Sequence, residues 1–179
     1  MLRHGFAFAN LDYGLAPETP LTEIILQIRR ALTFLVGQAD ALGFDPARIH
    51  LAGHSAGAHL AALAAVDPQG PPVRSALLLS GIFDLAPLAH LPMGPMIGLD
   101  SEATIRRLSP ISYPAPSPRI GVALGGLETD EFKRQSAEMA AAWGARAPLV
   151  VPERHHFNLL EDLRTETVLL ALALQVAAG

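Results

Sequence analysis

The sequence predicts an α/β protein with a mostly parallel sheet, and three observations carry this prediction. Short apolar runs of strand length alternate with longer segments whose apolar residues recur at helical spacing. One such run, residues 49–52, leads into a Gly/Ser turn and then directly into a helix-forming segment. Half of the residues are hydrophobic and only 17% are charged, which is typical of a sheet covered on both faces. Alternating strands and helices predict parallel pairing with right-handed crossovers.

The first part of the chain predicts two strands and two helices. Residues 5–13 alternate loosely between apolar and polar side chains and are expected to form the first strand. A long helix should follow, with Thr19 as N-cap, Pro20 as first helical residue and Gly43 at its end. Its apolar face consists of Leu21, Ile24, Ile25, Ile28, Leu32, Leu35 and Val36. The second strand and the second helix are expected at 49–52 and 58–66.

The second part predicts three more strands and two more helices around an irregular segment. The segment from Gly81 to Ser117 is rich in proline and lacks periodicity, so we expect a lid-like excursion of loops and short helices over the sheet. The strands are expected at 76–79, 120–124 and 149–151, and the helices at 131–143 and 159–178. Gly144 should stop the first of these helices.

Length and composition narrow the function classes. A chain of 179 residues is expected to form one domain, residues 1–179, with an ordinary core. The net charge of −4 and the lack of Lys/Arg clusters argue against nucleic-acid binding. The absence of cysteine excludes disulfides and thiolate chemistry. The longest apolar run, 168–178, is too short to span a bilayer, so we expect a soluble, cytoplasmic protein without a membrane partner.

The turn Gly53-His54-Ser55-Ala56-Gly57 has the G-x-S-x-G pattern of a nucleophile elbow. Such a turn holds its serine in a strained backbone conformation, so the flanking residues must be small, as Gly53, Ala56 and Gly57 are. The strain lifts the Ser55 hydroxyl above the sheet. The start of the following helix would place the Ala56 N–H where an oxyanion forms.

A serine hydroxyl needs a base, and the base needs a carboxylate that orients it. In α/β-hydrolases these partners follow the serine in the order acid, then histidine, in loops after later strands. Glu128 follows the 120–124 strand and is the favoured acid. Asp130, which suits a helix-capping role better, and Asp84, which follows the preceding strand, remain alternatives. His155 and His156 follow the last strand and compete as the base.

The other histidines favour structural roles. His50, His54 and His59 surround the turn but lack helical i, i+4 pairing with a carboxylate, so a zinc site is not expected. His54 occupies the variable position of the motif, where packing is the default interpretation. His4-Gly5 resembles the start of an oxyanion loop, but Phe6 follows and the expected strand begins at once.

Three stretches together resemble the arylformamidase (kynurenine formamidase) branch of the α/β-hydrolase fold, which is related to hormone-sensitive-lipase-type esterases. They are 53–61 (GHSAGAHLA), 79–85 (LSGIFDL), and 128–136 (ETDEFKRQS) with His156-Phe157. The resemblance implies an α/β-hydrolase fold with Ser55 as nucleophile, His156 as base and residue 128 as acid. The family usually has Asp at the acid position, where this chain has Glu128, one methylene longer.

The resemblance begins at the first expected strand, so the chain looks like an N-terminally truncated α/β-hydrolase. The family's His-Gly-Gly oxyanion loop and additional strands precede that strand, and this chain has no room for them. Ala56 then remains the obvious oxyanion donor, and one lost donor typically costs about 10²–10³ in rate. Either the first expected strand pairs directly with the 49–52 strand, or an unpaired sheet edge is left.

The resemblance implies a hydrolase that cleaves the formyl amide of an aromatic amine, converting N-formylkynurenine to kynurenine and formate in tryptophan degradation. A carboxylesterase acting on small acyl esters with the same triad is the first alternative. The second is a catalytically impaired fragment that needs a partner chain. All three readings involve a small molecule or a protein partner and no metal or organic cofactor. An exposed sheet edge would also allow a homo-oligomer.

Overall fold

A parallel sheet forms the centre of the fold. In the computed structural model, which describes residues 1–116 and 118–178, the sheet has four strands in the order β1-β2-β3-β4. The strands are β1 (His50–His54), β2 (Ser75–Leu79), β3 (Arg119–Gly125) and β4 (Leu149–Val151), and all three pairings are parallel. Their carboxyl ends therefore lie at one edge of the sheet, where loops can bring distant residues together.

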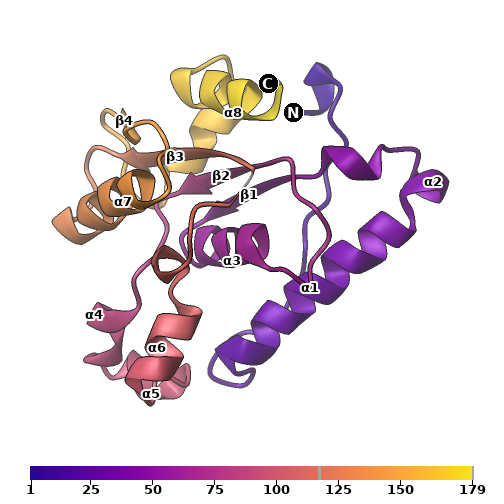
Figure 1. The fold of residues 1–179 in the computed structure, drawn as a ribbon. Helices are drawn as coiled ribbons and strands as arrows, with labels where there is room; N and C mark the ends of the chain where they lie inside the picture. Colours follow the sequence, from indigo (N-terminus) through magenta and orange to yellow (C-terminus); the bar gives the residue numbers. More distant parts are fainter. Residues whose placement is uncertain (117, 179) are drawn as a thin grey trace.

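Helices cover both faces of the sheet (Figure 1). Successive side chains of β2 point to opposite faces, so each face offers apolar residues to the helices that cover it. Ala76 and Leu78 point to one face, where they pack with α3 (Ala56–Val66) and α7 (Asp130–Ala142). Leu77 and Leu79 point to the other face, where α8 (Val168–Ala178) covers them. Every residue of β2 is buried, as expected for a central strand in a three-layer arrangement. The predicted α/β architecture is confirmed.

A further helix packs on the outer side of α3. Ile24, Ile28 and Leu32 of α1 (Leu21–Gly37) lie at helical spacing and bury themselves against Leu60 of α3. A short helix, α2 (Ala39–Leu42), continues the chain and ends at Gly43. Gly43 has a φ of 72°, a left-handed conformation that favours glycine at a helix end.

The predicted helix start at Thr19 and Pro20 is wrong by one step. The helix begins at Leu21, Pro20 is the N-cap, and no side chain caps it. Pro20 has the extended ψ of 145°, so its rigid ring ends the preceding loop and does not begin the helix. The predicted single helix to Gly43 is likewise divided, at Gly37 and Gln38.

The excursion between β2 and β3 consists of short helices, as the sequence predicts. They are α4 (Ala86–Ala89), α5 (Met93–Met96), α6 (Glu102–Leu108) and the 3₁₀ turn η3 (Pro110–Ser112). Leu85, Leu99 and Leu108 form a small core of their own in this region. Ser117, the last residue of the predicted excursion, lies outside the described residues.

The predicted first strand, 5–13, is wrong. These residues form no strand pairing with any described residue, and most of them are exposed. The preceding residues contact the segment before α8, where Arg3 donates to the Arg164 carbonyl and His4 lies 3.7 Å from Glu166. A strand forms only where its backbone hydrogen-bonds to a neighbouring strand. β1 therefore lies at the edge of the sheet, so of the two predicted outcomes the unpaired sheet edge is the one observed.

The predicted helix 159–178 is also wrong in its first half. Residues Leu159–Leu163 form the 3₁₀ helix η4, and α8 starts only at Val168. The Thr167 hydroxyl explains the late start, because it accepts a hydrogen bond from the Leu170 N–H and donates to the Asp162 carbonyl. Asp162 is itself held by Arg154 at 2.5 Å, which fixes η4 as a separate turn.

Candidate active site

Ser55 lies in a strained turn between β1 and α3. Its φ of 56° and ψ of −121° belong to a region that side-chain-bearing residues rarely adopt. The Ser55 N–H donates to the Leu79 carbonyl at 2.9 Å, which ties the turn to the end of β2. Gly53 permits the turn: a Cβ there would lie 2.1 Å from the Gly57 carbonyl oxygen. Gly57 carries no such constraint, because outside its own helix nothing lies within 4 Å of a Cβ placed there.

His156 reaches Ser55 from the loop after β4. Its Nε2 lies 2.9 Å from the Ser55 Oγ, and its Nδ1 lies 2.9 Å from Glu128 Oε2. The loop is held close to the end of β3, where the Leu127 N–H donates to the Arg154 carbonyl. Gly125 is required here, because a Cβ would lie 2.3 Å from that same carbonyl oxygen. The structure thus brings together the three residues that the sequence singled out.

The Glu128 carboxylate is buried and fully engaged. Its side chain has no exposed surface, and Oε2 accepts from His156. Oε1 accepts from the Gly125 N–H at 3.0 Å and from the Ser80 hydroxyl. These hydrogen bonds fix the orientation of the carboxylate. An acceptor at Nδ1 places the histidine proton there, so that Nε2 is free to accept from Ser55.

Ser80 is a site residue that sequence reasoning missed. It follows β2, is fully buried and has a φ of 46°, the second strained serine of the site. Its N–H donates to the Ala123 carbonyl at 2.8 Å, so the backbone is locked while the hydroxyl faces Glu128. Its position at the end of a buried strand was visible in the sequence, but no motif marks a serine there as a carboxylate partner.

The alternative acid and base candidates lie elsewhere. Asp130 is exposed and pairs with Lys133 on its own helix. Asp84 accepts from the Ala86 N–H and lies 3.9 Å from Arg134. His155 is exposed, and its Nδ1 accepts from the Phe157 N–H. None of these contacts involves Ser55 or His156.

The helix start beside Ser55 supplies a donor. Ala56 is the first residue of α3, so its N–H has no partner within the helix. The N-terminal end of a helix also carries partial positive charge. An oxygen that gains negative charge next to Ser55 would be stabilised by this N–H.

Aromatic rings surround the His156 imidazole. His54 and Phe132 each have ring centroids 4.5 Å from it, and Phe157 meets it edge-on at 5.4 Å. Two causes lower the pKa of His54 below its usual 6.5: the burial of its own ring and electrostatic repulsion from the neighbouring His156. His54 is therefore uncharged at neutral pH, and its Nε2 is buried without a hydrogen-bond partner among the described residues.

The motif residues after Glu128 serve to place α7. Gln135 is buried, and its Oε1 accepts from the N–H groups of Phe83 and Asp84. Its Nε2 donates to Glu131, whose pKa is lowered to about 2 by hydrogen bonds from Arg134 and Gln135. These contacts tie α7 to the loop after β2 and so set the position of Phe132 against His156.

The remaining histidines hold the fold together. His59 is buried in α3 and its Nε2 lies 2.7 Å from the Leu108 carbonyl, which links α3 to the end of α6. Burial lowers the His59 pKa to about 4, so the ring is neutral and donates this bond. His50 contacts the Ser75 hydroxyl at the opposite end of β1. Among residues 1–116 and 118–178, no three acidic or histidine side chains cluster as metal ligands would.

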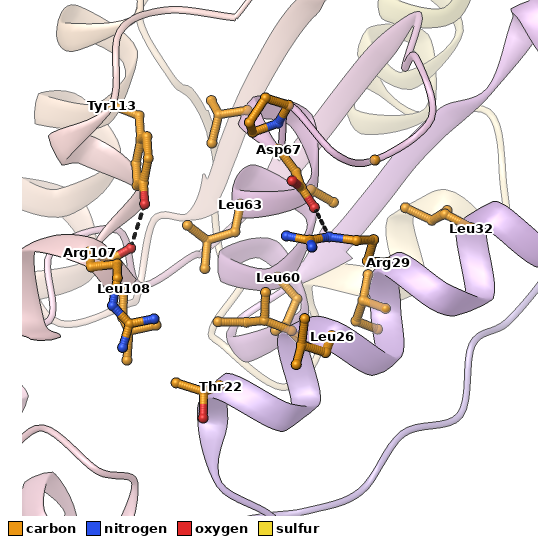
Figure 2. Close-up of a pocket in the computed structure, with 16 residues that line it drawn as sticks. Thr22, Leu26, Arg29, Leu32, Leu60, Leu63, Asp67, Arg107, Leu108 and Tyr113 are labelled. Carbon is orange, nitrogen blue, oxygen red and sulfur yellow. Dashed lines mark hydrogen bonds and ion pairs between the residues drawn. The ribbon is translucent and has the colours of Figure 1, made fainter.

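A hollow of about 310 Å³ lies on another part of the molecule (Figure 2). Apolar side chains of α1 and α3 line it, with the Arg29–Asp67 ion pair on one side and Tyr113 on the other. Ser55, Glu128 and His156 do not line this hollow. It is therefore separate from the site described above.

Comparison with known proteins shows which proteins this chain resembles. The BD-FAE family model matches residues 1–72. The kynurenine formamidase of Danio rerio is 28% identical over all of this chain, which spans 64% of that protein. A candidate thioesterase from Silicibacter sp. is 32% identical, with a TM-score of 0.77 over 90% of this chain and 61% of its own.

Two further solved structures decide the fold. The esterase LipW from Mycobacterium marinum is 27% identical, with a TM-score of 0.70 over 93% of this chain and 60% of its own. An α/β hydrolase from the metagenome of Lake Arreo, LAE6, is 24% identical with a TM-score of 0.67, over 93% of this chain and 60% of its own.

The chain has the α/β-hydrolase fold. The predicted resemblance to kynurenine formamidases and to esterases of this fold is confirmed. The chain spans somewhat less than two thirds of the length of these relatives. No helix in the described part of the chain is long and apolar enough to cross a membrane.

Proposed function

We propose that this chain is a serine hydrolase in which Ser55 is the nucleophile, His156 the general base and Glu128 the orienting acid. One observation carries the proposal: the continuous hydrogen-bonded path from the Ser55 hydroxyl through both ring nitrogens of His156 to the buried Glu128 carboxylate. This path is the geometry that activates a serine hydroxyl. The strained turn at Ser55 supports the same role.

The proposed reaction proceeds in two halves. The Ser55 Oγ attacks the substrate carbonyl carbon while His156 Nε2 takes the hydroxyl proton, and the Ala56 N–H donates to the oxyanion. His156 then gives that proton to the leaving amine or alcohol, whose bond to the carbonyl carbon breaks and leaves an acyl-serine. Water attacks this ester with His156 again as base, which releases the acid and restores Ser55.

For the substrate we propose the formyl amide of an aromatic amine, as in N-formylkynurenine. The chain-wide similarity to kynurenine formamidase of Danio rerio supports this choice. In that case the carbonyl carbon is a formyl carbon, the leaving group is an aromatic amine and the released acid is formate. A formyl group is the smallest acyl group, so little space is needed beside Ser55.

An esterase acting on small acyl esters is the second candidate, and the structural similarity to the esterase LipW favours it. The test compares turnover of N-formylkynurenine with that of p-nitrophenyl acetate, each for the wild-type chain and for Ser55→Ala. Hydrolysis of the formyl amide, lost in the variant, supports formamidase activity. Hydrolysis of the ester alone would retire it in favour of the esterase.

Labelling by a fluorophosphonate tests the nucleophile without reference to a substrate. We expect Ser55 of the folded chain to be labelled, and Ser55→Ala to remain unlabelled, because only an activated serine reacts quickly with this probe. A folded but unlabelled wild-type chain would favour the third possibility named above, a silent fragment that needs a partner chain.

A further inference from the structure

Two rings from different elements pack against the imidazole of His156. His54 comes from β1, one residue before Ser55, and its ring is tilted by 42° to His156 at a centroid distance of 4.5 Å. Phe132 comes from α7 and stacks at the same distance with an angle of 30°. Phe157 also touches the imidazole but is 88% exposed, so it restrains the ring far less.

Packing alone does not explain a histidine at position 54. Its Nε2 is buried and has no hydrogen-bond partner among the described residues, which is unfavourable for a polar atom. The ring also makes a hydrogen bond with the backbone of His156. His54 therefore contacts the proposed base through the face of its ring and through this hydrogen bond.

The proposed reaction sets two requirements for the rings that contact His156. His156 has to keep one orientation while it exchanges a proton with Ser55, and it becomes positively charged in each half of the reaction. Neutral aromatic faces next to a cation stabilise it. A second positive charge 4.5 Å away would do the opposite. His54 is kept uncharged by burial, and Phe132 cannot be charged.

We propose that His54 and Phe132 are positioning residues that clamp the His156 imidazole between Ser55 and Glu128; this inference rests on the proposed serine-hydrolase function. The clamp joins the strand that carries the nucleophile to the helix that follows the acid. Gln135 secures the second half of the clamp, because its hydrogen bonds to residues 83 and 84 fix α7.

The test separates the ring from the bulk of the side chain. His54→Phe keeps an aromatic face, whereas His54→Leu keeps an apolar volume without one. We expect kcat of the Leu variant to fall roughly 2- to 10-fold, the usual size of an aromatic pair contribution, with KM unchanged. The Phe variant should recover most of this loss. His50→Phe and His50→Leu, on the same strand but away from Ser55, are the matched controls and should keep wild-type kcat.

A spectroscopic readout is independent of turnover. The proton between His156 Nδ1 and Glu128 should give a downfield ¹H NMR resonance in the wild-type chain, identified by its absence in His156→Asn. We expect the resonance to persist in His54→Phe and to broaden in His54→Leu and Phe132→Leu, because the imidazole becomes mobile. Circular dichroism confirms that each variant is folded.

The outcomes distinguish the two proposals. If the His54→Leu variant keeps both kcat and a sharp resonance, or if His54→Phe fails as badly as Leu, the clamp is wrong while the serine-hydrolase proposal stands. If the wild-type chain neither turns over substrate nor reacts with fluorophosphonate, the proposed function is wrong. In that case the resonance alone still tests the clamp.

Discussion

The Glu128 side chain folds back over its own turn, which brings its carboxylate to His156 despite its length. The Glu128 N–H donates to the Gly125 carbonyl, which closes a turn directly after β3. The carboxylate then accepts from the Gly125 N–H with one oxygen and from His156 with the other. The extra methylene is taken up within the turn, and the carboxylate still reaches the imidazole at 2.9 Å.

Replacing Glu128 with Gln should nearly abolish turnover. An amide can offer an N–H toward Nδ1, which selects the wrong tautomer of His156, and the corresponding change in a serine protease lowers kcat about 10⁴-fold. We expect a loss of about 10³–10⁴ in kcat with KM little changed, measured with whichever substrate is turned over. Lys133→Gln, a change at an exposed position on α7, serves as control and should keep wild-type kcat.

Ser80→Ala should show how far the second carboxylate partner matters. A hydrogen bond to a charged group contributes about 1.5–3 kcal/mol, so the free energy of unfolding should fall by roughly that amount. The Gly125 N–H still holds Glu128, so kcat should drop about tenfold and not collapse. Urea unfolding and steady-state kinetics check both values. A wild-type kcat in this variant would mean that Ser80 only fills space.

His59 should make the fold sensitive to acid. Its folded pKa is about 4, whereas the unfolded ring titrates near 6.5. Between these values the unfolded chain binds more protons, so the free energy of unfolding falls as the pH falls, by about 1.4 kcal/mol per pH unit for one group. The expected total is on the order of 3 kcal/mol by pH 4.

The matched variant is His59→Gln, whose amide can still donate to the Leu108 carbonyl but does not titrate. Urea unfolding at pH 7, 6, 5 and 4 should give a pH dependence shallower by one proton than in the wild-type chain. Glu131, with a pKa of about 2, acts only below its ordinary value of 4.5 and leaves the upper part of the range unaffected. Equal slopes in both chains would show that His59 does not sense pH.

At the residue level the sequence was informative where chemistry imposes an order along the chain. Ser55, Glu128 and His156 could be singled out because each follows an apolar run and they occur in the order serine, acid, histidine. Ser80 and the rings of His54 and Phe132 could not, because their roles depend on which side chains meet across the strand ends. That information lies in the packing and not in any local pattern.

At the level of elements, the hydrophobic pattern predicts which strands are buried. It does not predict whether a segment finds a neighbouring strand to pair with. The strands around 76–79 and 120–124 are apolar throughout and form as predicted, since both faces are covered. Residues 5–13 have the loose alternation expected of a strand but pair with no strand among the described residues. Residues 159–167 are predicted as the start of the last helix because the local sequence does not reveal the hydrogen bond from the Thr167 hydroxyl to the Asp162 carbonyl, which holds a separate turn.

The two glycines of the turn at Ser55 should respond oppositely to alanine. At Gly53 a Cβ would collide with backbone atoms of Gly57 and Ala58, so α3 has to move away from β1. We expect Gly53→Ala to lose about 1–3 kcal/mol of stability, and kcat to fall about 10²-fold because Ser55 is displaced. At Gly57 a Cβ meets open space, so Gly57→Ala should be neutral or gain up to about 1 kcal/mol.

Urea unfolding and kinetics on both variants test this asymmetry. The motif alone treats the two glycines alike, whereas the structure requires only the first to lack a side chain. A Gly57→Ala chain as impaired as Gly53→Ala would mean that position 57 faces a neighbour that the four described strands do not provide.

At the scale of the whole molecule, the strand that precedes Ser55 lies at the edge of the sheet. β1 pairs only with β2, and its outer backbone groups have no strand partner among the described residues. Its five residues include no lysine, aspartate, glutamate or proline, the residues that usually protect an edge strand. Ser55 therefore follows a strand whose outer side is open among the described residues.

An open, uncharged edge strand should make the chain self-associate. We expect the average mass measured by analytical ultracentrifugation to rise with protein concentration, because β1 of one copy can pair with β1 of another. Ala52 is exposed in the middle of β1, so Ala52→Lys should keep the chain monomeric to higher concentration. Ala137→Lys, the same substitution at an exposed position of α7, is the control and should associate like the wild-type chain. Association unaffected by a lysine at position 52 would place the contact on another surface, because two lysines cannot face each other across a β1 pair without repulsion.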